Sequence, residues 1–201
     1  MQVDRTPAGP ARAIDFGPVR DGELELIDLG RGMTAAALAA ETRALVAQLR
    51  ALFADALDPD VTFVPDDPQA ADTFAADPTE EHLAWTAGHV VVHLTASAEE
   101  AAFLAAELAR GVEAHGRSRW EVPWTTMTTV ADCRQRLDES ERMLLATLDA
   151  WPDAPHLDVV FVNARGSVRN APARFLGGLM HADEHLGQVA EILRQARVSR
   201  G

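Results

Sequence analysis

The stretch HLAWTAGHVVVHLTASAEEAAFLAAELARG, residues 82–111, has the length and apolar spacing of a long helix packed against a core. At roughly 100° per residue, one stripe of such a helix collects its apolar side chains. The stripe comprises Leu83, Ala87, Val90, Leu94, Ala98, Ala101, Ala105, Leu108 and Val112. His93 lies roughly 100° from the centre of this stripe, and His89 lies roughly 140° away on the same side. His82 and Glu100 share that flank, so one shoulder of the helix is expected to carry histidines and a carboxylate.

The run FLGGLMHADEHLGQVAEILRQ, residues 175–195, repeats this arrangement near the C-terminus. Its apolar stripe comprises Phe175, Leu179, Ala182, Leu186, Val189 and Leu193. His185 lies roughly 100° from the centre of the stripe and His181 roughly 140° away, on the same rotational side as in the earlier helix. Two predicted helices therefore each present a histidine pair on the shoulder of an apolar face.

Both pairs have the H-x₃-H spacing, which places two imidazoles on one helix face, roughly 6 Å apart at Cβ. Two histidines at this spacing can bind one metal ion. A single pair of this kind is more often an ordinary boundary pair, but two pairs on matching shoulders favour a metal site. A shoulder lies between the core and the solvent, where a site open to a substrate can form.

The remaining sequence predicts an all-α fold, an up-down four-helix bundle. Thr34 and Thr79 are candidate N-caps for the first two helices. The connections are long and contain prolines, and DVVFVN with SVRN can form a small hairpin near residues 158–170. We expect the helices near residues 33–57, 79–112, 129–150 and 172–197.

The first 32 residues contain three prolines and five glycines, and they predict an irregular arm. A short extended piece is expected at ELELIDL (residues 23–29). We assign residues 1–32 to this arm and residues 33–201 to one bundle domain. With 201 residues, of which 47% are hydrophobic, the chain can bury a full core without disulfides.

Charge and composition narrow the class of protein further. Asp and Glu outnumber Lys and Arg by 31 to 18, and the net charge of −13 disfavours nucleic acid and anionic membrane surfaces as partners. Cys133 is the lone cysteine, which suits a reducing compartment. The N-terminal residues lack the apolar core of a signal peptide, and no apolar run reaches the ~18 residues of a membrane span. These features lead us to expect a cytoplasmic protein.

Two segments resemble signatures of the DinB/YfiT-like superfamily. WTAGHVVVHLTASAEE (residues 85–100) resembles its second-helix signature, and HADEHLGQVAEIL (residues 181–193) resembles its C-terminal signature, H-x₃-H-R-G-Q-I. The resemblance implies a DinB-like four-helix bundle in which His93, His181 and His185 hold a divalent metal. Leu186 stands where many relatives have arginine, and Val189 stands where isoleucine is usual.

The resemblance also bears on function. It implies a metal-dependent enzyme, foremost an S-transferase that uses a low-molecular-weight thiol such as bacillithiol or mycothiol, and it implies a homodimer. The alternatives are a metal-dependent hydrolase and a non-catalytic, metal-stabilised helical binding module. Three imidazoles suit Zn²⁺, Ni²⁺ or Fe²⁺, and the expected partner is a small-molecule thiol or an electrophilic substrate. The chain lacks the E-x-x-H motif, which argues against a ferritin-like di-iron bundle.

Several residues are candidates for a supporting role around the expected ligands. His89 lies one turn before His93, Glu100 shares the flank of His93, and Gln188 and Glu184 lie near His181. Each of these also has an ordinary interpretation as a solvated side chain. Further candidates are three tryptophans that can wall a pocket or simply pack, and two loop arginines that can meet an anionic substrate or only solvent: Trp85, Trp120, Trp124, Arg117 and Arg119.

Overall fold

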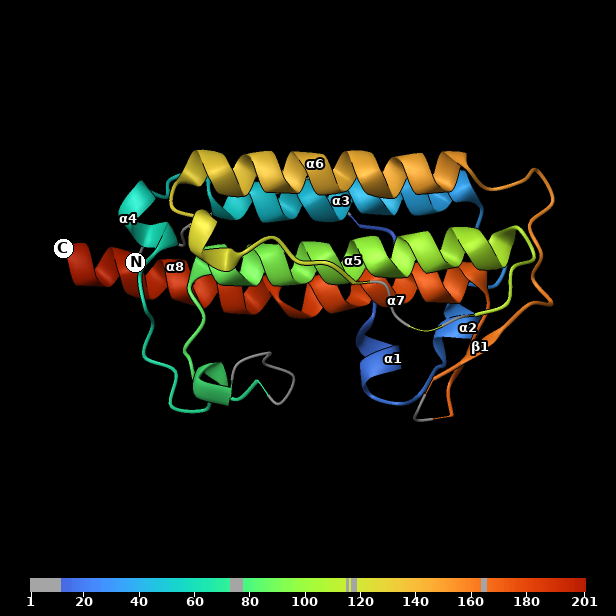
Figure 1. Ribbon diagram of the computed structural model, residues 1–201, viewed down its shortest axis with the longest axis horizontal. Coiled ribbons are helices and arrows are strands. Elements are labelled where there is room, and N and C mark those ends of the chain that lie inside the picture. Colours follow the sequence, from blue (N-terminus) through green and yellow to red (C-terminus); the bar gives the residue numbers. More distant parts are fainter. Residues whose placement is uncertain (1–11, 73–77, 115, 117–118, 164–165) are drawn as a thin grey trace.

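The computed structural model describes residues 12–72, 78–114, 116, 119–163 and 166–201. The protein is mostly helical, as the sequence predicts (Figure 1). Its long helices lie side by side, with α7 continuing directly into α8. These helices are α3 (Ala35–Leu52), α5 (Ala87–Ala109), α6 (Val130–Asp149), α7 (Ala171–Glu184) and α8 (Leu186–Arg200).

Side-chain caps explain where the long helices begin. The Thr34 hydroxyl accepts a hydrogen bond from the Ala37 backbone at the start of α3, so the predicted cap is confirmed. The Thr129 hydroxyl does the same for α6 and the Asn170 side chain for α7. The last predicted helix is divided at His185, where α7 ends and α8 begins, and it continues to Arg200 instead of ending by residue 197.

The start predicted for the second long helix, at Thr79, is wrong. Residues Pro78–Glu80 form only a 3₁₀ turn, and α5 begins at Ala87, after Thr86 caps the His89 backbone N–H at 3.2 Å. The segment before Thr86 instead pairs with the preceding connection, because the Asp72 backbone donates to the Glu81 carbonyl at 2.7 Å. A tertiary pairing therefore replaces the first two turns of the predicted helix.

The predicted up-down order is also wrong at one step, because α5 and α6 run in the same direction. Arg136 in the first half of α6 contacts Thr95 in the first half of α5. Late in both helices, Ala146 and Ala106 line one shared groove. Since the two helices are parallel, the connection between them must return along α5, and its described residues 119–129 lie beside the first half of that helix (Figure 1).

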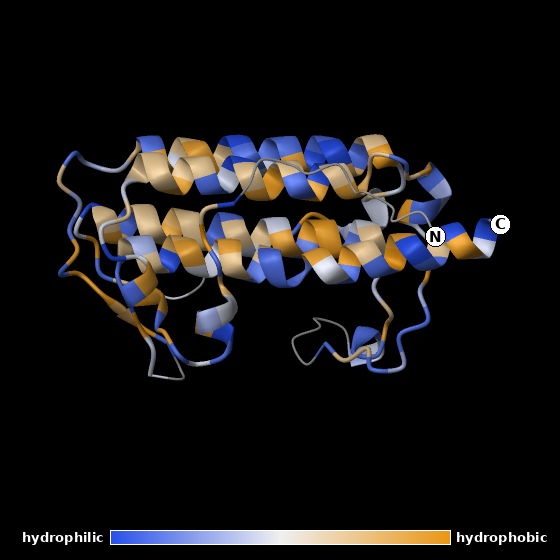
Figure 2. Ribbon diagram, turned by 180° about the vertical axis from the view of Figure 1, so that it is seen from behind, coloured by the Kyte–Doolittle hydropathy of each residue, from blue (hydrophilic) through white to orange (hydrophobic). Residues whose placement is uncertain are grey.

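The core lies between the long helices, and α5 is at its centre. Buried leucines and valines from every long helix meet there, including Leu45, Leu49, Val90, Leu94, Leu137, Leu144, Leu179 and Leu193. Figure 2 shows polar residues on the outward side of α6 and apolar residues toward its neighbours. Helices α5 and α7 approach closely, since a Cβ added at Gly178 would lie 2.7 Å from the Ala101 Cβ. This close approach brings the histidines of the two helices together.

The described part of the N-terminal arm packs on the bundle. It contains two single-turn helices, α1 (Gly17–Arg20) and α2 (Leu26–Leu29), so the extended piece predicted at ELELIDL is wrong for its second half. Leu26 packs into the core, which fixes the helical turn there. Arg12 forms ion pairs with Glu41 on α3 and with Asp183 on α7. The arm therefore fastens α7 at the level of its histidines.

Smaller elements occupy the connections. The predicted hairpin is confirmed, with β1 (Phe161–Val162) antiparallel to β2 (Val168–Arg169). Helix α4 (Asp58–Val61) follows α3, and the 3₁₀ turn η2 (Trp124–Thr126) precedes α6. Within the described residues, no helix combines the length and the apolar character that crossing a membrane requires.

Candidate metal centre

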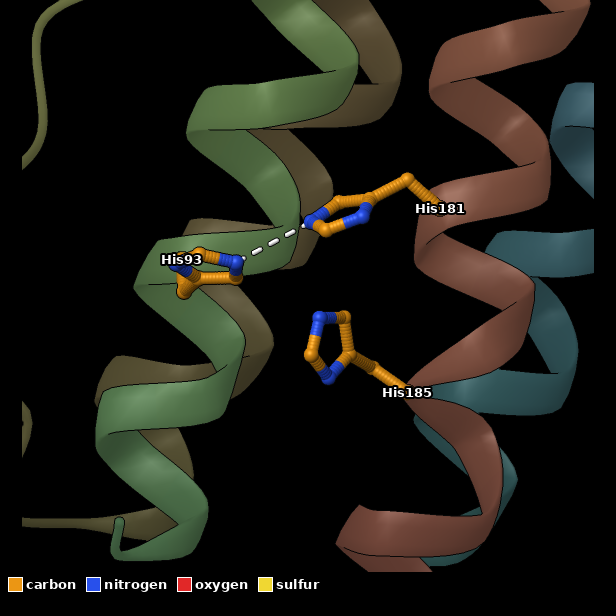
Figure 3. Close-up of side chains that lie close together, drawn as sticks. All are labelled: His93, His181 and His185. Carbon is orange, nitrogen blue, oxygen red and sulfur yellow. Dashed lines mark hydrogen bonds between the residues drawn. The ribbon is translucent and has the colours of Figure 1, made fainter. Parts of the chain in front are cut away.

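His93, His181 and His185 meet between α5 and α7, with one nitrogen of each ring directed into the space between them (Figure 3). The ring centroids of His93 lie 5.1 Å from His181 and 5.0 Å from His185, and those of His181 and His185 lie 4.7 Å apart. One nitrogen from each ring lies within 4.8 Å of the other two. Ligands at about 2.1 Å around a tetrahedral ion are separated by about 3.4 Å, so a shared ion requires at most about 1.4 Å of closure.

Hydrogen bonding indicates which nitrogens are free to coordinate an ion. The His185 Nδ1 lies 2.7 Å from the Gln188 Oε1, an acceptor that holds the proton on Nδ1 and leaves the Nε2 lone pair available. The His181 Nδ1 faces the Glu184 carboxylate at 3.9 Å, and its Nε2 lies 3.0 Å from the His93 Nε2. His181 in α7 and His185 at the junction of α7 and α8 are therefore both oriented to coordinate through Nε2. Gln188 supports His185, not His181 as the sequence suggested.

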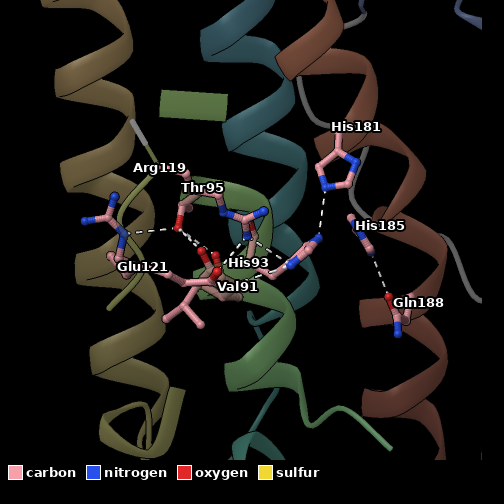
Figure 4. A network of polar contacts seen from close by, with 10 residues as sticks. Val91, His93, Thr95, Arg119, Glu121, His181, His185 and Gln188 are labelled. Atoms are coloured by element: carbon pink, nitrogen blue, oxygen red, sulfur yellow. Dashed lines mark hydrogen bonds and ion pairs between the residues drawn. The ribbon is translucent and has the colours of Figure 1, made fainter. Parts of the chain in front are cut away.

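The His93 Nδ1 lies between two charged side chains from the 119–129 connection (Figure 4). The Arg119 guanidinium donates to Nδ1 at 3.1 Å, and the Glu121 carboxylate lies 3.8 Å from the same atom. A neutral imidazole carries one proton, so a ring that accepts from Arg119 at Nδ1 has its proton on Nε2. Coordination through Nε2 requires the other tautomer, whose Nδ1–H finds its acceptor in Glu121. Glu121 was missed in the sequence because nothing but its proximity to Arg119 marks it.

Burial keeps all three rings neutral. It lowers the pKa of His93 to about 2, with a further contribution from the Arg119 charge. It lowers the pKa of His181 to about 4, with His185 as the next cause, and it lowers the pKa of His185 too. Because metal ions bind the unprotonated ring, the site is ready for an ion at neutral pH without losing protons first.

Trp85 packs beside the three histidines and joins them to His89. Its ring centroid lies 4.5 Å from His93 and 6.2 Å from His185. His89 stacks between Trp85 at 4.5 Å and Trp124 at 5.0 Å, and it is only 9% exposed. Burial lowers the pKa of His89 to about 4. His89 therefore touches the site through Trp85, whereas Trp120 is 75% exposed and does not line the cavity beside the histidines.

The histidines open onto a cleft of about 680 Å³ between α5 and α7. Gln188 and Trp85 line it near the histidines, and Arg119 and Glu121 line it from the connection. Glu100 lies further along α5, two turns from His93, so it faces the cleft at a distance from the ring cluster. Cys133 is fully buried away from the cleft, and burial raises the pKa of its thiol to about 12. The cleft can therefore hold a small molecule against the histidines, and Cys133 is no nucleophile.

The predicted candidate Arg117 lies outside the described residues, and so does His115. His156 is in the loop before the hairpin, where its backbone N–H donates to the Ala109 carbonyl at 2.9 Å, so it is remote from the ring cluster in the fold.

A scan against models of protein families gave no match, and neither did a search of curated proteins or a search of solved structures. Among the described residues, the group of side chains able to hold one metal ion consists of His93, His181 and His185.

Proposed function

We propose that the protein is a DinB-like metalloenzyme that binds a divalent ion through the Nε2 atoms of His93, His181 and His185. The observation that carries the proposal is the convergence of three ring nitrogens, all within 4.8 Å of one another, on the wall of an open cleft. The low pKa values support it, because metal ions bind neutral imidazoles. The Gln188 acceptor at the His185 Nδ1 also supports it, because it leaves the His185 Nε2 lone pair free to coordinate. The two sequence signatures support the same three positions.

Three imidazoles suit Zn²⁺, Ni²⁺ or Fe²⁺, and three protein ligands leave at least one coordination position for a substrate. A site that serves only stability normally closes with four protein ligands. The described residues offer three, beside a cleft large enough for a small molecule, and this favours catalysis over a purely structural ion.

The reaction we propose is the transfer of a low-molecular-weight thiol to an electrophile. The thiol loses its proton, its sulfur bonds to the electrophilic carbon, and the bond between that carbon and the leaving group breaks, with the electron pair going to the leaving group. The ion would supply Lewis acidity, which lowers the pKa of a bound thiol so that it is nucleophilic near neutral pH. The protein's own groups do the rest. Gln188 orients His185, Trp85 packs against His93 and limits access of water, and Arg119 lines the cleft as a guanidinium that can bind an anionic substrate.

Metal-dependent hydrolysis is the second candidate, and Glu121 favours it. Its carboxylate lines the cleft beside His93, and burial raises its pKa despite the nearby Arg119 charge. A carboxylate with a raised pKa is a suitable base for activating water. S-transfer and hydrolysis therefore make different demands on Glu121.

Two measurements on the full chain, purified without a nickel column, test the proposal. Elemental analysis is expected to find about one divalent ion per chain in the wild type and in the control His156→Ala, and almost none in His181→Ala. The loaded protein is then offered mycothiol or bacillithiol with an electrophile, and separately a set of ester and amide substrates. Thiol consumption that survives Glu121→Gln supports S-transfer. Hydrolysis that disappears in Glu121→Gln supports the second candidate, and a wild type without metal refutes both.

A further inference from the structure

The cleft continues along α7 beyond the three histidines. Arg174, Gly178, His181 and His185 follow one another at intervals of four, three and four residues, which places them on one face of the helix. All four line the cleft. Arg174 and His181 are seven residues apart, or about 10 Å along the helix axis. The cleft therefore reaches about two helical turns from the histidines to Arg174.

Arg169, at the end of β2, joins Arg174 at this far end. Its guanidinium lies over Gly177, because a Cβ added there would be only 2.6 Å from the Arg169 Nη1. The Arg174 guanidinium lies over the Phe161 ring of β1, 4.7 Å from its centroid. The hairpin and the missing side chain at Gly177 thus hold two half-buried guanidinium groups against one end of the cleft.

The net charge of the cleft indicates what kind of substrate group these two arginines would bind. All 18 basic residues of the chain are arginines, in a protein of net charge −13. Of the described residues, three arginines and four acidic residues line the cleft: Arg119, Arg169, Arg174, Asp67, Asp72, Glu100 and Glu121. A divalent ion at the histidines would turn this near balance into an excess of about one positive charge. One carboxylate on a substrate would neutralise it.

From this arrangement we infer that Arg169 and Arg174 form a carboxylate-binding subsite. The planar guanidinium group pairs with a carboxylate through two parallel hydrogen bonds, which an ammonium group cannot do. The second half of the inference rests on the proposed function: the substrate is a small molecule with a carboxylate about two helical turns from the group that reacts at the metal. The subsite itself requires no metal.

Hexanoate is the probe for the subsite alone, measured by calorimetry or NMR on the full chain after chelator treatment. Arg169→Gln and Arg174→Gln are each expected to weaken hexanoate binding at least tenfold. The control is Arg194→Gln, which removes an exposed arginine of α8 paired with Glu191 and is expected to change nothing. Failure of the wild type to bind hexanoate, or equal affinity in the arginine variants, overturns the inference.

Gly177→Ala gives a second variant in which no charge is lost. The added methyl group meets the end of the flexible Arg169 side chain, which can move aside, so the fold is expected to persist while the guanidinium is displaced. Weaker hexanoate binding in this variant supports the subsite even where an arginine variant fails to fold. Unchanged binding there shows that the position of Arg169 is irrelevant and removes it from the subsite.

A pair of thiols tests the link between the subsite and the metal. The Co²⁺-loaded protein is titrated with 6-mercaptohexanoate and with 6-mercapto-1-hexanol, and binding is followed by thiolate-to-cobalt absorption. The carboxylate is expected to tighten binding at least tenfold, and Arg174→Gln is expected to abolish the difference. Equal affinity of the two thiols for the loaded wild type refutes the inference. Failure of Co²⁺ or of both thiols to bind refutes the proposed function instead, and the hexanoate result then decides the subsite alone.

Discussion

The two histidine pairs of this protein have the same spacing and different surroundings. On α7, His181 and His185 both turn toward the ring cluster. On α5, only His93 does so, while His89 is stacked between Trp85 and Trp124. The difference arises from what lies opposite each turn of the helix, because α7 faces His93 whereas Trp124 of the 119–129 connection covers His89. Spacing brings two imidazoles to one face, and the neighbouring elements decide which of them can share an ion.

The largest effect is expected from removing a histidine of the ring cluster. His181→Ala or His185→Ala should lower the affinity for Zn²⁺ by more than tenfold. Mutating a residue that only supports a ligand typically lowers metal affinity 10–100-fold, and losing the ligand itself should cost at least as much. His89→Ala should change it by far less. Competition with a chromogenic chelator measures all three affinities. Equal losses for His89→Ala and His181→Ala would abolish the distinction between the two pairs.

Gly178→Ala tests whether the close approach of α5 and α7 is what brings His93 to the His181/His185 pair. Its methyl group would lie 2.7 Å from the Ala101 Cβ and 3.1 Å from the Ala98 Cα, neither of which can move freely. The overpacking should destabilise the protein by about 1–3 kcal/mol and lower its Zn²⁺ affinity. Urea unfolding and chelator competition measure the two effects. Gly187→Ala is the control, since no atom lies within 4 Å of its added Cβ.

Glu121→Gln should have a smaller effect on the ion than the loss of a ligand. The carboxylate is the acceptor for the Nδ1–H of a coordinating His93, so its loss should weaken Zn²⁺ binding by about tenfold. Arg119→Met should not weaken binding, because Arg119 stabilises the tautomer of His93 that cannot coordinate through Nε2. Calorimetric titration of both variants gives the comparison. Weaker binding in Arg119→Met than in Glu121→Gln would contradict this account of His93.

The smallest effect is expected at His89. His89→Phe keeps an aromatic ring between the two tryptophans and removes a buried Nδ1 that has no hydrogen-bond partner among the described residues. The variant should be as stable as the wild type at neutral pH, or more stable by about 1 kcal/mol, with unchanged metal content. Urea unfolding at pH 7.5 measures this. A large loss of stability would show that His89 makes a polar contact that the fold depends on.

The same variant should show how stability depends on pH. The pKa of His89 is lowered to about 4 in the folded protein, against about 6.5 in an unfolded chain. Between these values the unfolded chain binds more protons, so the stability due to a neutral His89 is full above about pH 6.5 and declines as the pH falls toward 4. The advantage of His89→Phe over the wild type should therefore be greater at pH 4.5 than at pH 7.5. The other buried histidines contribute to both proteins and cancel in the difference.

The features that the sequence could predict are those determined locally. Thr34 caps its helix by contacts within four residues, and the apolar stripes place His93, His181 and His185 on the shoulders of α5 and α7. The start of α5 could not be predicted from local signals. The helix is shortened by a backbone hydrogen bond between Asp72 and Glu81, which lie nine positions apart in the chain. The parallel course of α6 could not be predicted either, because the connection before α6 runs along α5 and Met127 packs over Gly88, where an added Cβ would lie 2.7 Å from the Met127 carbonyl oxygen.

The residues of the site also divide into those with a local sequence signal and those that only tertiary contacts bring together. Its three histidines carry a periodic signal, and Arg174 shares the helix face of His181. Glu121 and Arg169 come from a connection and a hairpin, and no spacing in the sequence relates them to the histidines. Only the fold brings them to one cleft. Dimerisation and the identity of the metal stay predictions, for which sedimentation and elemental analysis are the measurements.

X-ray absorption at the zinc edge of the loaded protein is the most direct test of whether these three histidines form one metal centre. The account predicts three imidazole nitrogens at about 2.0–2.1 Å, together with a light atom from solvent. His93→Ala should reduce the imidazole scattering by about one ring of three, while His89→Ala should leave the spectrum unchanged. Three results would contradict the account: sulfur bound to zinc in protein to which no thiol was added, four imidazoles around zinc, or an unchanged spectrum in His93→Ala.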